Sequence, residues 1–410
     1  MLGVRAVHDA GRRSCLVGVL TATTIVSAAC GPAAPAAPSG ASAFQGNASH
    51  AGFVPSASSA VVPRLLWELP GPGTDTYSVI EGNRVFATVP PTVTRPGALV
   101  ALDRTTGRTS WGPVDLGSTG HERPGLAVAD GRVVVMNNEG RVQTFASADG
   151  RRLWQYQPAA EKSSASSPVI SGTTVYVVNS GAGRRLTALD AATGRVRWSR
   201  ANLSVSDGGA PAVVAGLVVL ASDCETVAFA ADTGAPKWST PRTCYGSGGR
   251  TVSGTGGTVG VPSIGGDVAI RNASTGALIR RQPRTGDGGP NPVSFASGRV
   301  VSSASGSTAT TLQAREQSSG RVLWTQSVRH NGTTHGTLPP LVVGSRVWWV
   351  SNEGGLTSHD LATGTQLSRT LLPGTLASRV STDDLGLSSD GKVLLVPLYG
   401  KLLAYRIAAE

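Results

Sequence analysis

The stretch LTALDAATGRVRW, residues Leu186–Trp198, decides the fold because it recurs along the chain. Two other copies are close to it, LVALDRTTGRTSW (Leu99–Trp111) and TVAFAADTGAPKW (Thr226–Trp238). Four degenerate copies, VQTFASADGRRLW, VAIRNASTGALIR, LQAREQSSGRVLW and LTSHDLATGTQLS, begin at Val142, Val268, Leu312 and Leu356. Self-similarity of this kind is the signature of a repeat architecture.

The turn glycines of the seven copies are evenly spaced. Neighbouring glycines are 40 to 44 residues apart, and they are Gly107, Gly150, Gly194, Gly234, Gly276, Gly320 and Gly364. Within each unit, apolar and β-branched runs with period-two alternation lie between glycine-containing turns, as in antiparallel strands. Four such strands per repeat match the blade of a β-propeller. We therefore predict an all-β fold built from four-stranded antiparallel blades.

The two ends of the chain together predict one more blade. Lys392–Pro397 and Lys401–Ile407 look like the second and third strands of an eighth unit, but the chain stops before its fourth strand. Leu65–Leu69 looks like a fourth strand without the three that should precede it. Pairing the N-terminal strand with the C-terminal strands completes an eight-bladed ring over residues 61–410. A seven-bladed ring would leave these strands without partners.

The N-terminus has the features of an export signal. A basic start with three arginines is followed by an uncharged stretch, Ser14–Ala29, which is shorter than the roughly 20 apolar residues of a membrane span. The stretch leads into Cys30 through a sequence that resembles a bacterial lipobox, with Ser27 in place of the usual leucine. We predict a lipoprotein signal peptide over residues 1–29 and a lipidated Cys30. Ordinary signal-peptidase cleavage before Cys30 is the alternative, and the general and twin-arginine export routes both remain open.

The next segment has the composition of a linker. Residues 31–60 contain 24 alanine, serine, proline or glycine residues and no charged side chain. Such a composition is typical of a flexible chain that buries no core. We therefore predict that residues 30–60 are the lipidated cysteine and a flexible tether, and that residues 61–410 are the globular domain. No other stretch is apolar and long enough for a transmembrane helix.

The charge of the chain favours no nucleic-acid partner. The sequence has 36 lysine and arginine residues against 25 aspartate and glutamate residues, a net charge of +11. The basic residues are scattered, whereas a nucleic-acid footprint gathers them on one face or helix. We expect at most a weak attraction to anionic surfaces such as a membrane or cell wall.

The unit A-L-D-x-x-T-G-x-x-x-W is similar to the PQQ-like propeller repeat of quinoprotein dehydrogenases, over about 350 residues. This resemblance implies that the tryptophan of each blade docks against the next blade, where the alanine and glycine make room for it. The docking tryptophans are then Trp67, Trp111, Trp154, Trp198, Trp238 and Trp324. Arg280 and Ser368 stand at this position in the two remaining copies.

The resemblance does not extend to the cofactor site. Quinoprotein dehydrogenases build that site with long loops, a calcium-binding acidic set and a disulfide between adjacent cysteines, whereas this chain has near-minimal blades and no adjacent cysteines. The chain also resembles lipoproteins of the BamB type, which have eight blades and carry no cofactor. We therefore expect a non-enzymatic binding or scaffold lipoprotein with no cofactor and no metal. A quinone-dependent dehydrogenase and another extracytoplasmic propeller enzyme, such as a lyase or hydrolase, are the alternatives.

Polar residues are expected where the innermost strands begin, at one mouth of the central channel. By alignment of the repeats they are His121, Glu122, Asp207, Arg250, Asn291, His335 and Asp383. Such a ring of polar groups can bind a small ligand or metal, with His335 and Asp383 in neighbouring blades, or it can simply solvate the channel mouth. The sequence spacing enforces no metal geometry.

Two cysteines remain in the mature chain besides Cys30. Cys224 follows the second strand of the fourth blade and Cys244 follows the fourth strand, so both emerge at the same end of that blade. An exported protein meets oxidising conditions, and we predict a disulfide between them, with two free thiols as the alternative. The expected partners are the membrane, through the lipid, and proteins at the cell surface or in a periplasm.

Overall fold

The computed structural model describes residues 41–409 except 58–59, 71–76, 90–94, 118–123, 138, 159–165, 180–183, 204–208, 223, 242–250, 264–265, 284–291, 307, 330–337, 352–353, 374–384 and 399. The chain divides into two compact units, Met1–Ala37 and Pro38–Glu410, and every described residue belongs to the second unit. Among these residues, no helix is both long enough and apolar enough to pass through a membrane.

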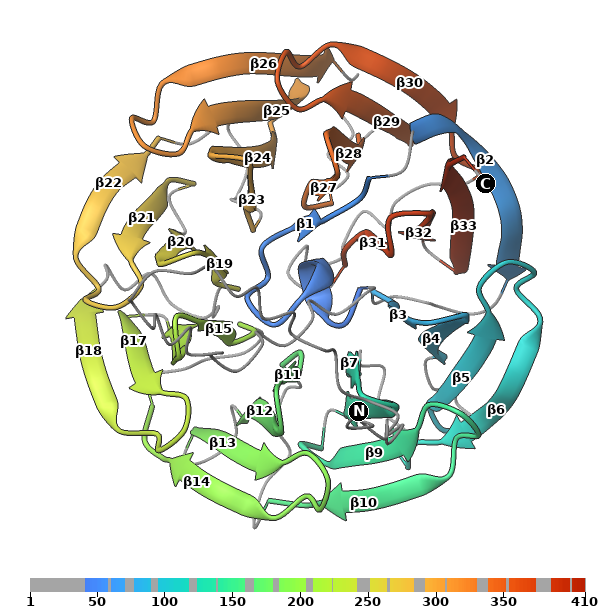
Figure 1. The fold of residues 1–410 in the computed structure, drawn as a ribbon, viewed down its shortest axis with the longest axis vertical. Coiled ribbons are helices and arrows are strands. Elements are labelled where there is room, and N and C mark those ends of the chain that lie inside the picture. The colour runs from blue at the N-terminus through green and yellow to red at the C-terminus, as the bar shows by residue number, and fades with distance from the viewer. Residues whose placement is uncertain are drawn as a thin grey trace, which may run out of the picture. The chain divides into compact units, whose positions relative to one another are not determined.

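The second unit consists of eight β-sheets arranged as blades around a central axis (Figure 1). The first four blades follow one another along the chain, each with its innermost strand first. Blade 1 is β3 Val79–Glu81, β4 Arg84–Val89, β5 Ala98–Asp103 and β6 Thr109–Asp115. Blade 2 is β7 Gly125–Ala129, β8 Arg132–Met136, β9 Val142–Ala146 and β10 Arg152–Tyr156. Blade 3 is β11 Val169–Ser171, β12 Thr174–Asn179, β13 Arg185–Asp190 and β14 Val196–Arg200, and blade 4 is β15 Ala212–Val214, β16 Leu217–Ala221, β17 Glu225–Ala230 and β18 Pro236–Pro241.

The remaining blades continue around the ring. Blade 5 is β19 Ser253–Thr255, β20 Thr258–Pro262, β21 Val268–Asn272 and β22 Leu278–Gln282. Blade 6 is β23 Ser294–Ala296, β24 Arg299–Ser305, β25 Ala309–Glu316 and β26 Val322–Arg329. Blade 7 is β27 Leu341–Val343, β28 Arg346–Val350, β29 Gly355–Asp360 and β30 Gln366–Leu371, with β1 Phe53–Val54 added in parallel to β27. Blade 8 is β31 Ser388–Ser389, β32 Val393–Leu398, β33 Lys401–Ala408 and β2 Ala60–Pro70.

Blade 8 joins the two ends of the chain, which confirms the predicted eight-bladed ring and its closure. The outer strand β2 pairs antiparallel with β33, from Ala60 opposite Ala408 to Pro70 opposite Lys401. An ion pair between Lys401 Nζ and Glu68 Oε1, 2.7 Å apart, lies at the end of this pairing. The strand is longer than the predicted segment Leu65–Leu69, because its pairing with β33 continues back to Ala60.

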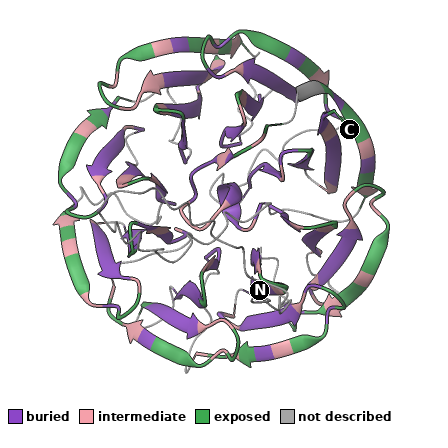
Figure 2. Ribbon diagram, viewed as in Figure 1, coloured by how far each residue is buried: buried purple, intermediate pink, exposed green. Residues whose placement is uncertain are grey.

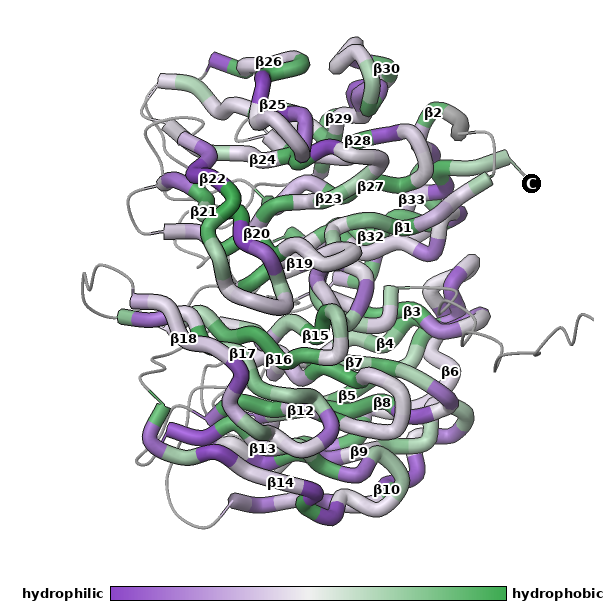
Figure 3. The backbone as a smooth tube through the Cα atoms, turned by 60° about the vertical axis from the view of Figure 1, so that its left-hand side comes forward, coloured by the Kyte–Doolittle hydropathy of each residue, from purple (hydrophilic) through white to green (hydrophobic). Residues whose placement is uncertain are grey.

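Burial explains why the middle strands are almost continuously apolar. Each blade packs between two others, so both faces of a middle strand are covered; β13, for example, buries four consecutive residues, Leu186 to Leu189. The outer strands are mostly exposed or half-buried, and in β14 only Trp198 is buried. Figure 2 shows the buried inner strands within an exposed outer rim, and Figure 3 shows apolar colour on β12 and β16 against polar colour on β14.

The repeated Asp-x-x-Thr-Gly segment forms the turn between the third and fourth strands. Asp190 Oδ1 accepts hydrogen bonds from the N–H groups of Ala192 and Thr193 and from the Thr193 hydroxyl. The Arg197 guanidinium and these donors lower the pKa of Asp190 to about 2. Gly194 completes the turn at φ +70°, in the left-handed region that favours glycine.

Each of the six blade-docking tryptophans lies against the turn glycine of the next blade. A Cβ atom at Gly107 would lie 2.7 Å from the Trp67 ring, so only glycine leaves room for the indole. The Trp67 Nε1–H donates to the Arg104 carbonyl at 2.8 Å, and the other five indoles make the equivalent bond at 2.9 to 3.0 Å. The tryptophans therefore pack adjacent blades together around the ring, and Trp67 does so at the closing seam.

Candidate functional site

Most of the sequence-predicted site residues lie outside the described residues. This applies to the channel-mouth positions His121, Glu122, Asp207, Arg250, Asn291, His335 and Asp383, and also to Cys30 and Cys244. Cys224 lies directly before β17, but with Cys244 outside the described part the disulfide between them stays a prediction. The described residues instead reveal an arrangement on the axis that the sequence analysis missed.

Residues 41–57 lie inside the ring, where the sequence analysis placed a flexible tether over 30–60. In Figure 1 they form the blue segment at the centre, with the short 3₁₀ helix η1 Phe44–Gly46 on the axis. Many of these residues are buried, among them Ala41, Phe44, Gln45, His50 and Ala51. The tether prediction is therefore corrected for residues 41–57, which belong to the propeller.

Backbone hydrogen bonds attach this axial segment, residues 41–57, to the inner strands. The innermost strand of a blade has an unpaired edge toward the axis, and its N–H groups need acceptors. Carbonyl groups of the axial segment accept from six inner strands at 2.7 to 2.9 Å, belonging to blades 1, 2, 4, 5, 6 and 7. The donors are Ile80, Val128, Val213, Gly254, Phe295 and Val342, and the acceptors are Ala41, Ser42, Ala48, Ser49, Ala51 and Gly52, respectively. The segment thus visits the blades in their order around the ring.

Phe44 is the apolar anchor of the axial segment. Its side chain is fully buried, and its ring packs edge-on against Tyr77, with the ring centroids 5.2 Å apart. On another side the backbone of Gly386, before β31, comes so close that a Cβ atom there would lie 2.8 Å from the Phe44 ring. One aromatic side chain from the segment therefore fills the space between blades 1 and 8.

His50 links the axial segment to blade 4 through a fully buried imidazole. Its Nδ1 lies 2.7 Å from the Phe44 carbonyl oxygen and its Nε2 lies 2.9 Å from the Pro211 carbonyl oxygen. Burial lowers the pKa of His50, and the two carbonyl contacts oppose that shift. A neutral imidazole donates one hydrogen bond only, so it satisfies one of the two carbonyl groups at a time.

The described residues on the axis do not fit a quinone and calcium site. A tricyclic quinone needs a pocket that covers most of its surface, with fixed polar groups around it. Phe44, Gln45 and His50 are buried inside the ring, and the nearby backbone groups bond to the inner strands. Across the described ranges, histidine, cysteine, aspartate and glutamate side chains form no group of three or more that could hold a metal ion.

The sequence carried a weak signal for the axial segment. The run of small residues is interrupted by three bulky side chains, Phe44, His50 and Phe53. A flexible tether does not need bulky side chains. Most of the binding, however, is through main-chain carbonyl groups, which every residue has. Residue types alone therefore do not mark this segment.

The sequence of the chain matches one known protein family. A family model described as "Outer membrane protein assembly factor BamB" matches residues 59–204, 160–297 and 282–409. No curated protein matches the chain.

Solved structures share the fold at low sequence identity. The crystal structure of BamB from Moraxella catarrhalis is 17% identical, with a TM-score of 0.63, and the match covers 84% of this chain and 100% of that one. Quinohemoprotein alcohol dehydrogenase from Comamonas testosteroni is 14% identical, with a TM-score of 0.67 and coverage of 90% and 80%. A computationally designed protein, Ika8, is 16% identical, with a TM-score of 0.65 and coverage of 84% and 99%.

Proposed function

Because the chain belongs to the family of the outer membrane protein assembly factor BamB, we propose that it is an exported, lipid-anchored propeller that binds partner proteins and catalyses no reaction. The partners lie outside the cytoplasm, at the cell surface or in a periplasm. Residues 1–29 are the signal peptide, Cys30 carries the lipid, and Cys224 pairs with Cys244 under the oxidising conditions that exported proteins meet.

The observation that supports a non-enzymatic role is the axial segment. The resemblance to quinoprotein dehydrogenases implies that a cofactor site would lie at the centre of the ring. Here that space contains the protein's own residues 41–57, attached to six inner strands. A scaffold protein does not need an open central site, because its partners can bind to the blade rims and turns.

The anchor is tested by Cys30→Ser in the full precursor. We expect the wild-type protein in the membrane fraction and the variant in the soluble exported fraction, because the thiol that accepts the lipid is gone. Mass spectrometry of the wild-type N-terminus should show a lipid mass on residue 30. An unmodified mature N-terminus at any other residue would contradict the anchor.

The absence of quinone chemistry is tested by calorimetry of the mature protein with pyrroloquinoline quinone and calcium. We expect no saturable heat, because the axial segment would have to leave before a cofactor could enter. A quinoprotein dehydrogenase with a known site serves as the positive control. Saturable micromolar binding, about −8 kcal/mol, would favour the quinone-dependent dehydrogenase instead.

A further inference from the structure

An unusual cluster of arginines surrounds the third turn of blade 6, residues 316–320. Its members, called the arginine cluster below, are Arg280, Arg299, Arg315 and Arg321. Two of them replace apolar residues of the repeat. Arg280 stands at the docking-tryptophan position, and Arg315 stands where blades 1 to 4 have leucine or phenylalanine, as at Leu189, and where blade 5 has Arg271. At these two positions, positively charged side chains therefore replace apolar side chains of the repeat.

Arg280 and Arg315 are half-buried and bond only to main-chain oxygen atoms in the described part of the chain. Arg280 Nη1 donates to the Gln317 carbonyl and its Nη2 to the Glu316 carbonyl, while Arg315 Nη1 donates to the Gly320 carbonyl at 3.1 Å. The Nε atoms of both are buried and have no hydrogen-bond partner among these residues. Burial lowers the pKa of both groups, and for Arg280 the neighbouring charge of Arg315 lowers it further. Among the described residues, no carboxylate forms an ion pair with either of these two arginines.

The acidic groups nearby do not balance the cluster. Glu316 Oε2 lies 3.9 Å from Arg321 Nε, and this is the one ion pair of the cluster within the described residues. Hydrogen bonds from Thr363 are the main cause that lowers the pKa of Asp360 in blade 7, and the nearby charge of Arg299 adds to them. Within the described residues, the four arginines therefore lie near two carboxylates, and an anion bound by Arg299 and Arg321 would reduce the mutual repulsion.

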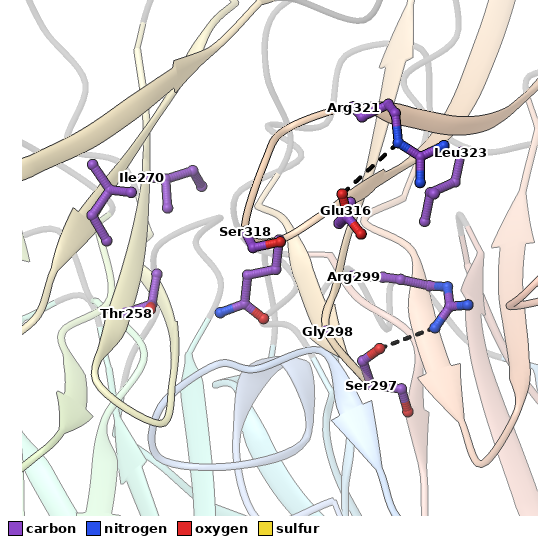
Figure 4. Close-up of a pocket in the computed structure, with 11 residues that line it drawn as sticks. Thr258, Ile270, Ser297, Gly298, Arg299, Glu316, Ser318, Arg321 and Leu323 are labelled. Atoms are coloured by element: carbon purple, nitrogen blue, oxygen red, sulfur yellow. Dashed lines mark hydrogen bonds and ion pairs between the residues drawn. The ribbon is translucent and has the colours of Figure 1, made fainter.

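A cavity of about 680 Å³ opens beside the cluster, between blades 5 and 6 (Figure 4). Arg299, Glu316 and Arg321 line it from blade 6, and Ile270 and Ile279 line it from blade 5. Ile279 is 51% exposed, so an apolar surface lies next to the charged groups of the cavity. Arg299 also lines a second cavity, of about 650 Å³, on the side of blade 7.

We propose that this cavity binds an acidic segment of a partner protein, with its carboxylates on Arg299 and Arg321 and an apolar side chain against Ile279. The guanidinium group matches a carboxylate in shape and charge. The apolar wall and the recess between two blades fit a peptide better than a membrane surface, which would need a flat basic face. The proposal names the partner chemistry for the scaffold function and rests on that function.

The test uses the mature full chain and a fluorescein-labelled peptide of alternating aspartate and leucine. We expect saturable binding in fluorescence anisotropy. The double variant Arg299→Ala, Arg321→Ala should weaken binding at least about tenfold, because two charge-assisted hydrogen bonds are lost. The variant Arg299→Lys, Arg321→Lys keeps the charge but not the fork geometry and should lose less. A matched peptide of asparagine and leucine should bind at least about tenfold more weakly than the aspartate peptide.

Blade 2 supplies the matched control. Arg132 and Arg151 hold the positions of Arg299 and Arg321 there, while Trp111 and Phe145 replace the two buried arginines. The variant Arg132→Ala, Arg151→Ala should bind the peptide like wild type.

Three outcomes would overturn the proposal. They are no saturable peptide binding, equal loss in the two double variants, and arginine-dependent binding to phosphatidylglycerol vesicles without peptide binding. If the blade 6 double variant still captures the membrane partners of the wild type, the cavity is not their binding site, while the scaffold function stands.

Discussion

A chain that starts at Gly71 is expected to aggregate more strongly than a chain that starts at Ala57. The first lacks β2, the outer strand that pairs with β33 along its length, and it leaves the β33 edge open to other chains. It also lacks Trp67, whose docking onto Gly107 closes the ring; loss of a buried tryptophan alone costs about 3 kcal/mol or more. Light scattering after size exclusion compares the two chains.

The two starting points separate closure from the axial segment, because neither chain contains residues 41–56. The single variant Trp67→Ala adds a version that keeps every strand and loses only the seam contact. Trp238→Ala is its matched control, since it removes the same docking at a seam where the chain itself joins the two blades. A monomeric Gly71 chain with unchanged thermal stability would mean that the seam needs no β2.

Phe44→Ala should lower the free energy of unfolding by about 3 kcal/mol and loosen the axial segment. The side chain is fully buried between Tyr77 and Gly386, so its removal leaves a cavity that the backbone around it cannot fill. Thermal unfolding measures the first effect, and limited proteolysis within residues 41–57 measures the second. Phe53, which is only half-buried in the same segment, provides the control, and Phe53→Ala should cost less.

A second variant approaches the same contact from the other side. Gly386→Val places carbon atoms where the Phe44 ring lies, so it should expel the ring without changing the segment itself. We expect the same protease sensitivity from Gly386→Val as from Phe44→Ala. Wild-type resistance in both variants would contradict the anchoring role of Phe44.

The ring was predictable because its signal is repeated and periodic. Seven turn glycines with even spacing define the blades, and the unmatched strands at the two ends define the closure. The close contact between glycine and tryptophan, as between Gly194 and Trp154, explains why this pair recurs. Physical constraints that act in every blade leave a pattern that one sequence can reveal.

The axial segment and the arginine cluster were not predictable in the same way. The segment binds through carbonyl groups such as those of Ala41 and Gly52, so its small residues look like a linker. In the sequence, Arg280 is visible only as a departure from the repeat. The sequence does not show that Arg299 and Arg315 lie around the same turn as Arg280. The predicted channel-mouth residues, such as His335 and Asp383, lie outside the described residues and stay predictions.

The axial segment and β2 both contact residues near the other end of the chain. The Ser56 hydroxyl donates to the Gly391 carbonyl, 335 residues later in the chain. Strand β2, near the N-terminal end of the ring, pairs with β33 at its C-terminal end. Contacts of such sequence separation carry a large loop-closure entropy and slow the rate of folding. The residues at the N-terminal end of the ring are therefore expected to be among the last to reach their native positions, although they are synthesised first. Until the last blade has formed, the strand edges of the open ring stay unpaired, and such edges promote aggregation.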